Sequence, residues 1–325
     1  MRALTVVVWL STSTAFAAGG QASPALAHAR QLFDARNLDA ARAEFAALAR
    51  ATPTDAIPVL YLGKIALSQN DNDEAVRQLE HCVAIEEQNA ECHLWLGNAL
   101  GTSAQHASKF RQPFLARRTK TEFERAVALD PASVDARMGL VQFYMLAPGF
   151  MGGSMDKARE QVAEVEKHSK LRGALGVGML ADHDKDLKST EAAYQRAIVA
   201  APDSAAGYYA LVNLLAREKR WNEAFATLDQ LIAHVPAEAN AQLAVARVAL
   251  LSGEQLEKGE AAAKKWLMAP PKDAPATLVS AARFRLAALY EKAGKKELAR
   301  AEYERALTIN PKNEDARKAL DALRS

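Results

Sequence analysis

The sequence has few of the residues that indicate catalysis or nucleic-acid binding. It holds only two cysteines, 6% aromatic residues and a formal net charge of +2 in 325 residues. A net charge so close to zero argues against nucleic-acid binding, which needs a concentrated basic face. After the first residues there is no apolar run long enough to cross a bilayer. Alanine, by contrast, is abundant. Because alanine is the best helix former and lets helices approach closely, we expect an all-α protein.

Motifs of catalysis and metal binding are also missing. The seven histidines are scattered, and there is no G-x-S-x-G or H-E-x-x-H motif. Asp182, Asp184 and Asp186 alternate as in a calcium loop, but Leu187 stands where such a loop has Gly and Ala193 where it has Glu. We therefore expect a turn between helices here, with no metal and no cofactor.

The first residues have the pattern of a targeting signal. Arg2 supplies a short positive region, residues 3–10 are apolar but too few to span a bilayer, and Ala15-Phe16-Ala17 is an A-x-A cleavage site. An uncleaved anchor is the alternative, disfavoured because residues 11–14 interrupt the apolar run. We predict a signal peptide over residues 1–17, cleavage after Ala17, and a periplasmic or secreted mature protein over residues 18–325.

Residues 280–311 contain one complete copy of a pattern that recurs along the chain. Leu286, Ala287 and Tyr290 form an apolar stripe on a first helix, Ala299 and Tyr303 lie on one face of a second, and Pro311 ends the unit. Small residues such as Ala287 and Ala299 suit places where two helices cross closely. A lone helix pair cannot bury its apolar stripe, so similar units must stack against it.

The order of a small residue, a large apolar residue and a closing proline recurs upstream. Clear copies are Ala41, Phe45 and Pro53 in the first unit, and Ala224, Leu228 and Pro236 in the sixth. The third and fifth units carry Thr119 and Thr190 in the small position. The predicted units are residues 22–55, 56–89, 90–133, 134–170, 171–204, 205–238, 239–273 and 280–313, followed by a polar-faced capping helix over 313–325.

The 34-residue spacing from Pro202 to Pro236 and pieces such as FERAVALDP and YERALTINP resemble the tetratricopeptide repeat family. The resemblance implies one right-handed α-solenoid of about eight helix-turn-helix repeats. Because these repeats use up the chain, no segment remains for a catalytic domain. We therefore expect a protein without enzymatic activity.

Two places depart from the regular repeat. Glu87 to Pro131 spans 44 residues, ten more than a repeat, which predicts that both helices of the third unit are lengthened into a projecting hairpin. This hairpin is expected to be either a solvated basic face, the favoured interpretation, or a docking site for an acidic partner or membrane surface. Its tip carries cations interleaved with phenylalanines: Lys109, Phe110, Arg111, Phe114, Arg117, Arg118 and Lys120.

The second departure is LAPGFMGGSM, residues 146–155. Its proline and glycines forbid a continuous helix, and Ser154 can cap the helix that follows. A phosphate-binding loop is disfavoured because no strand precedes it and no Lys-Ser or Lys-Thr pair is present. We expect a turn with Phe150 and Met151, either packed on neighbours or used as a contact.

The two cysteines lie equally far from the turn near Glu87, in His81-Cys82 and Cys92-His93. A four-ligand metal site is disfavoured because adjacent helix residues point about 100° apart. The cysteines can face each other across adjacent helices, so either a Cys82–Cys92 disulfide or two buried free thiols are compatible with the sequence.

The resemblance also suggests where a partner binds. In this family the residue after the helix-crossing position of the first helix tends to face the concave groove. We therefore expect a protein or peptide partner in that groove, with an accessory module for a glycan or another envelope polymer as the alternative. Amides could grip a peptide backbone, and Lys64 and Arg247 could attract acidic ends. The alternative is that these residues are solvated polar positions on a curved surface. The groove positions are Arg30, Lys64, Asn98, Gln142, Met179, Asn213 and Arg247, to which we add Tyr209 as an expected binding residue.

Overall fold

The computed structural model describes residues 23–272 and 274–324. Within these residues the chain forms seventeen α-helices and one short 3-10 helix, with no β-strand. The predicted signal peptide and its cleavage after Ala17 lie outside the described residues. None of the described helices combines the length and hydropathy needed to span a bilayer.

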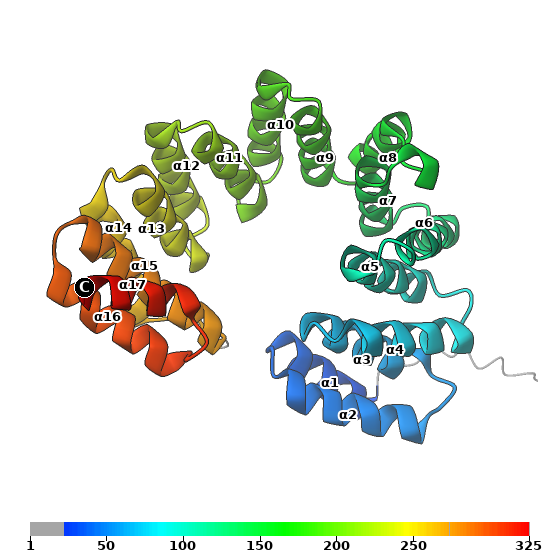
Figure 1. Ribbon diagram of the computed structural model, residues 1–325. Coiled ribbons are helices and arrows are strands. Elements are labelled where there is room, and N and C mark those ends of the chain that lie inside the picture. Colours follow the sequence, from blue (N-terminus) through cyan, green and yellow to red (C-terminus); the bar gives the residue numbers. More distant parts are fainter. Residues whose placement is uncertain (1–22, 273, 325) are drawn as a thin grey trace, which may run out of the picture.

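The helices pair off in chain order, and the pairs follow one another around an open arc (Figure 1). The last helix, α17, follows the eighth pair and has no partner of its own. The prediction of an all-α solenoid is confirmed. The bounds are α1 (Pro24–Asp34), α2 (Leu38–Ala51), α3 (Ala56–Ser68), α4 (Asn72–Ile85), α5 (Ala90–His106), α6 (Gln112–Leu129), α7 (Val134–Leu146), η1 (Gly149–Met151), α8 (Met155–His168), α9 (Lys170–His183), α10 (Leu187–Ala200), α11 (Ala205–Arg217), α12 (Trp221–His234), α13 (Asn240–Ser252), α14 (Leu256–Met268), α15 (Ala276–Lys292), α16 (Lys296–Ile309) and α17 (Glu314–Arg324).

Small residues allow the two helices of a pair to cross closely. A Cβ atom placed on Gly63 would lie 2.5 Å from Leu79 Cγ, and one on Gly178 would lie 2.2 Å from Tyr194 Cε1. These distances are shorter than any real contact, so only glycine fits at these crossings. Thr190 is fully buried in a small-residue position, and its hydroxyl donates to the Asp186 carbonyl at 2.7 Å, which satisfies the buried polar group.

The first helices line the inner side of the arc. α3 contacts α5, α5 contacts α7, and α7 contacts α9, in addition to each helix's contacts with its own partner. Contact between successive first helices means that they lie at the smaller radius, as Figure 1 shows for α5 and α7.

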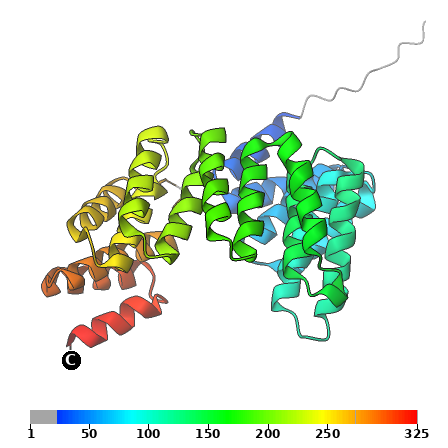
Figure 2. The ribbon, with the colours of Figure 1, turned by 90° about the horizontal axis from the view of Figure 1, so that it is seen from above.

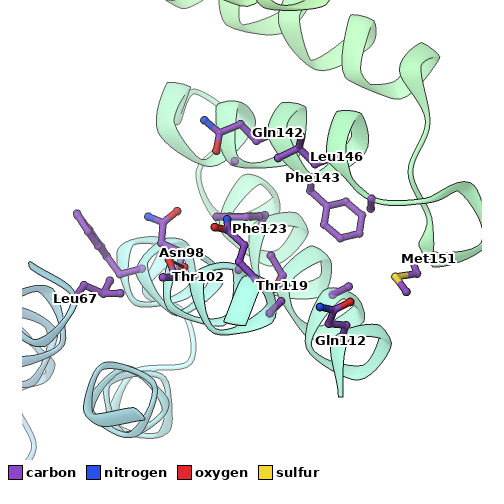
Figure 3. Close-up of a pocket in the computed structure, with 18 of the residues that line it drawn as sticks. Leu67, Asn98, Thr102, Gln112, Thr119, Phe123, Gln142, Phe143, Leu146 and Met151 are labelled. Atoms are coloured by element: carbon purple, nitrogen blue, oxygen red, sulfur yellow. Dashed lines mark hydrogen bonds between the residues drawn. The ribbon is translucent and has the colours of Figure 1, made fainter. Parts of the chain in front are cut away.

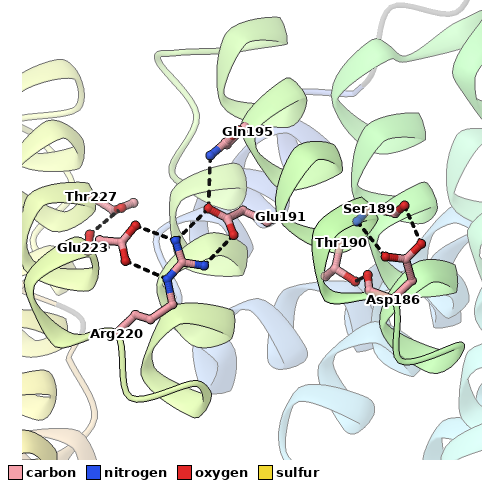
Figure 4. Close-up of polar contacts among 8 residues, drawn as sticks. All are labelled: Asp186, Ser189, Thr190, Glu191, Gln195, Arg220, Glu223 and Thr227. Atoms are coloured by element: carbon pink, nitrogen blue, oxygen red, sulfur yellow. Dashed lines mark hydrogen bonds and ion pairs between the residues drawn. The ribbon is translucent and has the colours of Figure 1, made fainter.

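Ion pairs tie neighbouring repeats together at the surface. Arg220, at the start of α12, donates to Glu191 of α10 at 2.5 Å and to Glu223 of its own helix at 2.6 Å (Figure 4). The hydrogen bond from Arg220 lowers the pKa of Glu223. Because all three side chains are at least partly exposed, these ion pairs add little stability. We assign them the role of holding α10 in register with α12.

The C-terminal helix covers the last repeat. Ala316 and Leu320 of α17 are buried, while most of its other residues are exposed. Asn313 joins α17 to the last repeat. Its side-chain NH2 donates to the Ser280 hydroxyl at 2.9 Å, and its side-chain oxygen accepts from the Ala316 backbone N–H at 3.1 Å. This is the polar-faced end that a solenoid needs, since it shields the final apolar surface.

Candidate binding site on the inner face

The third repeat is lengthened, as its sequence predicts. α5 has 17 residues and α6 has 18, whereas α3 and α4 of the preceding repeat have 13 and 14. The turn between α5 and α6 consequently projects past the neighbouring hairpins (Figure 2). The extra length widens the inner face beside α7.

A cavity of about 660 Å³ lies at this widened place. Its walls come from α5 and α7, its floor from α6, and its end from the segment after α7 (Figure 3). It is larger than the cavities beside Trp266, about 220 Å³, and between α10 and α12, about 400 Å³. Because concave pockets of this size are the usual binding sites of small domains, we take it as the candidate site.

Phe123 forms the centre of the floor, held between two glycines. A Cβ on Gly97 of α5 would lie 2.7 Å from the ring, and one on Gly139 of α7 would lie 2.6 Å from it. The ring is 4% exposed. One turn beyond Gly97 the packing opens, because a Cβ on Gly101 would meet only Thr119 Cγ2, at 3.5 Å. The Thr119 hydroxyl donates to the Leu115 carbonyl at 2.9 Å, so its proton is not available to a ligand.

The polar lining of the cavity is uncharged. Asn98 projects from α5 and Gln142 from α7, and Phe123 lies beside them (Figure 3). Among the described residues that line this cavity there is no lysine, arginine, aspartate or glutamate. Amide groups both donate and accept hydrogen bonds, so the site suits a neutral polar ligand such as a peptide backbone. The remaining polar lining residues are Asn70, Thr102, Gln105, Gln112 and Thr119.

The irregular segment after α7 closes one end of the cavity. Ala147, Pro148 and Met151 line it, and the segment turns back through Gly152, whose φ is +98°. A Cβ on Gly153 would lie 1.7 Å from the Ala147 carbonyl oxygen, so only glycine permits this return. Ser154 caps α8 by accepting from the Lys157 backbone N–H, as predicted. The two departures from the repeat pattern therefore build one cavity.

Among the predicted groove residues, Asn98 and Gln142 line the cavity and Lys64 does not. Lys64 is 9% exposed, its ammonium group pairs with Glu91 of the next repeat, and it lies 4.7 Å from the centre of the Tyr61 ring and 4.9 Å from that of Trp95. The Lys64 ammonium is therefore already paired within the protein, and its role in attracting an acidic end remains a prediction.

The C-terminal groove residues form a separate group. Arg247 of α13 donates to the Asn213 side-chain oxygen of α11 at 2.6 Å. Burial, together with the charge of Arg247, lowers the pKa of Arg285 on α15. Tyr209 is partly buried against the C-terminal core, where burial and Glu238 raise the pKa of its phenol. None of these residues lines the cavity. Their role in binding remains a prediction.

The remaining predicted residues lie away from the cavity, except Met151. Lys109, Arg111 and Arg117 are exposed at or near the α5–α6 turn. Arg118 pairs with Glu80 at 2.6 Å and lies 5.9 Å from the Phe114 ring. Phe150 is 84% exposed, whereas Met151 turns toward the cavity.

Cys82 and Cys92 are joined by a disulfide between α4 and α5, with their Cα atoms 5.7 Å apart. Both cysteines are fully buried. His93 is separately engaged: its Nδ1 lies 2.6 Å from Glu122 and its Nε2 lies 2.9 Å from the Glu87 carbonyl oxygen. In the described part of the chain, His, Cys, Asp and Glu form no group of three or more that could hold a metal ion.

Sequence reasoning missed several residues of the site. Trp95, Gln112, Phe143 and Gly101 line the cavity but do not stand at the family's groove positions. The ten-residue excess was the available signal, because a local lengthening of two helices must open space beside the next, normal-length repeat.

Comparisons with known proteins agree with the repeat fold. Two family models, each described as tetratricopeptide repeat, match residues 26–81 and 280–313. Comparison with curated protein sequences finds no match.

Among solved structures, the chain is similar to a thermophilic TPR protein from Thermus thermophilus. The identity is 17% and the TM-score 0.52, over 59% of this chain and 97% of that one. It is also similar to a tetratricopeptide repeat protein from Parabacteroides merdae, at 12% identity and a TM-score of 0.52, over 93% of this chain and 98% of that one. At these identities the likeness establishes the fold alone.

Proposed function

Since this chain is a tetratricopeptide repeat protein, we propose that it is a non-enzymatic scaffold that binds a partner protein through the inner face of its solenoid. The observation that carries the proposal is the uncharged cavity between α5 and α7. Asn98 and Gln142 can hold a backbone amide from opposite walls, while the apolar floor around Phe123 receives one large side chain.

The ligand favoured by this lining is an internal, uncharged segment of a partner. A chain terminus or a strongly charged motif would bring a formal charge into a cavity with no countercharge, which costs free energy. A neutral glycan is the second candidate, because Trp95 and Phe143 supply aromatic surface beside the same amides.

The binding test uses peptides selected from a random display library on the folded protein. Selected peptides should contain a large apolar residue flanked by uncharged residues. The double variant Asn98→Ala/Gln142→Ala should weaken their binding roughly tenfold or more in fluorescence anisotropy, because two hydrogen bonds are lost. Gly101→Leu should block binding by filling the cavity.

Asn222→Ala/Gln230→Ala is the matched control, since both are exposed amides on α12 that neither line the cavity nor stand at a predicted groove position. It should leave affinity unchanged. Peptides whose binding is indifferent to both cavity variants would place the site elsewhere. Selective binding of neutral glycans, with the same sensitivity to Asn98 and Gln142, would favour the second candidate.

We further propose that the protein works in the periplasm or outside the cell. The pattern of residues 2–17 supports export, and the Cys82–Cys92 disulfide supports an oxidising compartment. N-terminal sequencing of the protein purified from its native source tests this. The expected first residue is Ala18, and a retained Met1 would contradict the proposal.

A further inference from the structure

Three aromatic side chains stand out by their exposure. Phe110 is 96% exposed, Phe150 84% and Phe114 64%. Every other phenylalanine, tyrosine and tryptophan in the described part of the chain is buried or partly buried. Exposed aromatic surface is unfavourable in water, so its concentration at one place points to an interaction.

All three phenylalanines lie at the same end of adjacent hairpins. Phe110 is in the α5–α6 turn, Phe114 is in the first turn of α6, and Phe150 is in η1. The segments touch: α6 contacts η1, and Lys120 Cδ lies 3.7 Å from the Cβ position of Gly152. Figure 2 shows that this end projects from the body of the solenoid. We use the name hairpin tip for these three phenylalanines together with the cations Lys109, Arg111, Arg117, Arg118 and Lys120.

The charge of the hairpin tip has one sign. Residues 92–121 and 136–155, which include the hairpin tip, contain no aspartate or glutamate, and the next acid after residue 155, Asp156, pairs with Arg159 at 3.1 Å. Arg118 is paired with Glu80, and Lys120 lies 3.5 Å from Glu124. No ion pair joins Lys109, Arg111 or Arg117 to any described residue, so three exposed cations lie unpaired in the same segment as Phe110 and Phe114.

We propose that the hairpin tip docks on the surface of an anionic phospholipid bilayer. Phenyl rings insert at the boundary between headgroups and acyl chains, and nearby cations are attracted to the negative surface. A convex tip built from two turns suits a bilayer, which needs no matching shape, whereas a folded acidic partner would need a complementary hollow. Gln112 and Met151 line the cavity beside the tip, so the docked protein holds its partner close to the membrane.

The test measures co-sedimentation with vesicles of phosphatidylcholine alone and of phosphatidylcholine with phosphatidylglycerol. It uses the chain beginning at Ala18, because residues 3–10 are apolar and would bind vesicles themselves. The first described helix begins at Pro24, so this chain keeps every described helix. Binding should appear with the anionic vesicles and fall steeply as salt is added.

Two sets of variants separate charge from apolar insertion. Lys109→Gln/Arg111→Gln/Arg117→Gln should weaken partitioning about a hundredfold, at roughly fivefold for each cation near the surface. Phe110→Ser/Phe150→Ser should weaken it by at least about tenfold.

The matched controls are in the C-terminal half. Lys265→Gln/Lys272→Gln/Lys292→Gln removes three exposed lysines, and Val199→Ser/Met268→Ser removes side chains that are 81% and 84% exposed. Both controls should bind vesicles like the parent.

Failure to bind anionic vesicles, or tip variants that bind like the controls, would overturn the proposal. So would concentration-dependent self-association, or capture of an acidic protein, that requires the tip while vesicle binding is absent. Peptide binding in the cavity should survive the tip substitutions, so this proposal and the proposed function can fail separately.

Discussion

Two glycines one turn apart on α5 should respond differently to the same substitution. Gly97→Ala places a methyl group 2.7 Å from the Phe123 ring, whereas Gly101→Ala places it 3.5 Å from Thr119 Cγ2, an ordinary contact. Both glycines lie inside the helix, where alanine is favoured over glycine by about 1 kcal/mol. The propensity term is therefore the same for both, and the difference measures packing.

The magnitudes follow from that separation. Gly101→Ala should stabilise the protein by about 0.5 to 1 kcal/mol. At Gly97 the ring cannot easily yield, because it also lies against Gly139, so overpacking costs about 1 to 3 kcal/mol and cancels or exceeds the gain. Gly97→Ala should therefore be less stable than Gly101→Ala by roughly 1 to 3 kcal/mol.

Urea denaturation followed by far-ultraviolet circular dichroism gives the midpoints. Repeat arrays can unfold in parts, so hydrogen exchange of the α5 and α6 amides supplies the local measurement. Equal stabilities for the two variants, or a Gly97→Ala protein more stable than Gly101→Ala, would refute the assignment of Phe123 as a ring held between α5 and α7.

Three further predictions concern the scaffold. Ala299→Leu should lower stability by on the order of 1 to 3 kcal/mol, because Ala299 is fully buried at a helix crossing; an unchanged melting midpoint would refute the repeat register. Cys82→Ser/Cys92→Ser should cost about 3 kcal/mol by releasing a short loop, and native protein should show no reactive thiol until it is denatured and reduced. Burial and Glu124 raise the pKa of the Tyr144 phenol from 10.0 to about 12. Because the folded protein holds the phenol proton more tightly than the unfolded chain does, the stability is unaffected below pH 10 and falls as the pH rises from 10.0 through about 12. Tyr144→Phe should therefore lose less stability than the parent across this interval in urea titrations.

The sequence by itself determined the repeating architecture. Spacing of small and large residues along one helix depends only on local geometry, so the pattern at Ala287, Ala299 and Tyr303 predicted helices that the structure contains. The same local argument predicted the lengthened α5 and α6, the cap at Ser154, and a terminal helix with one buried face.

Only the tertiary structure decided which of these residues meet. Lys64 has the spacing of a groove cation, and only the structure shows that its ammonium group pairs with Glu91 of the next repeat. The lengthened hairpin and the segment after α7 looked like two separate irregularities, yet Gln112 and Met151 line one cavity. The physical reason is that a repeat pattern specifies each helix pair, whereas the space and charge left between pairs depend on how successive repeats stack.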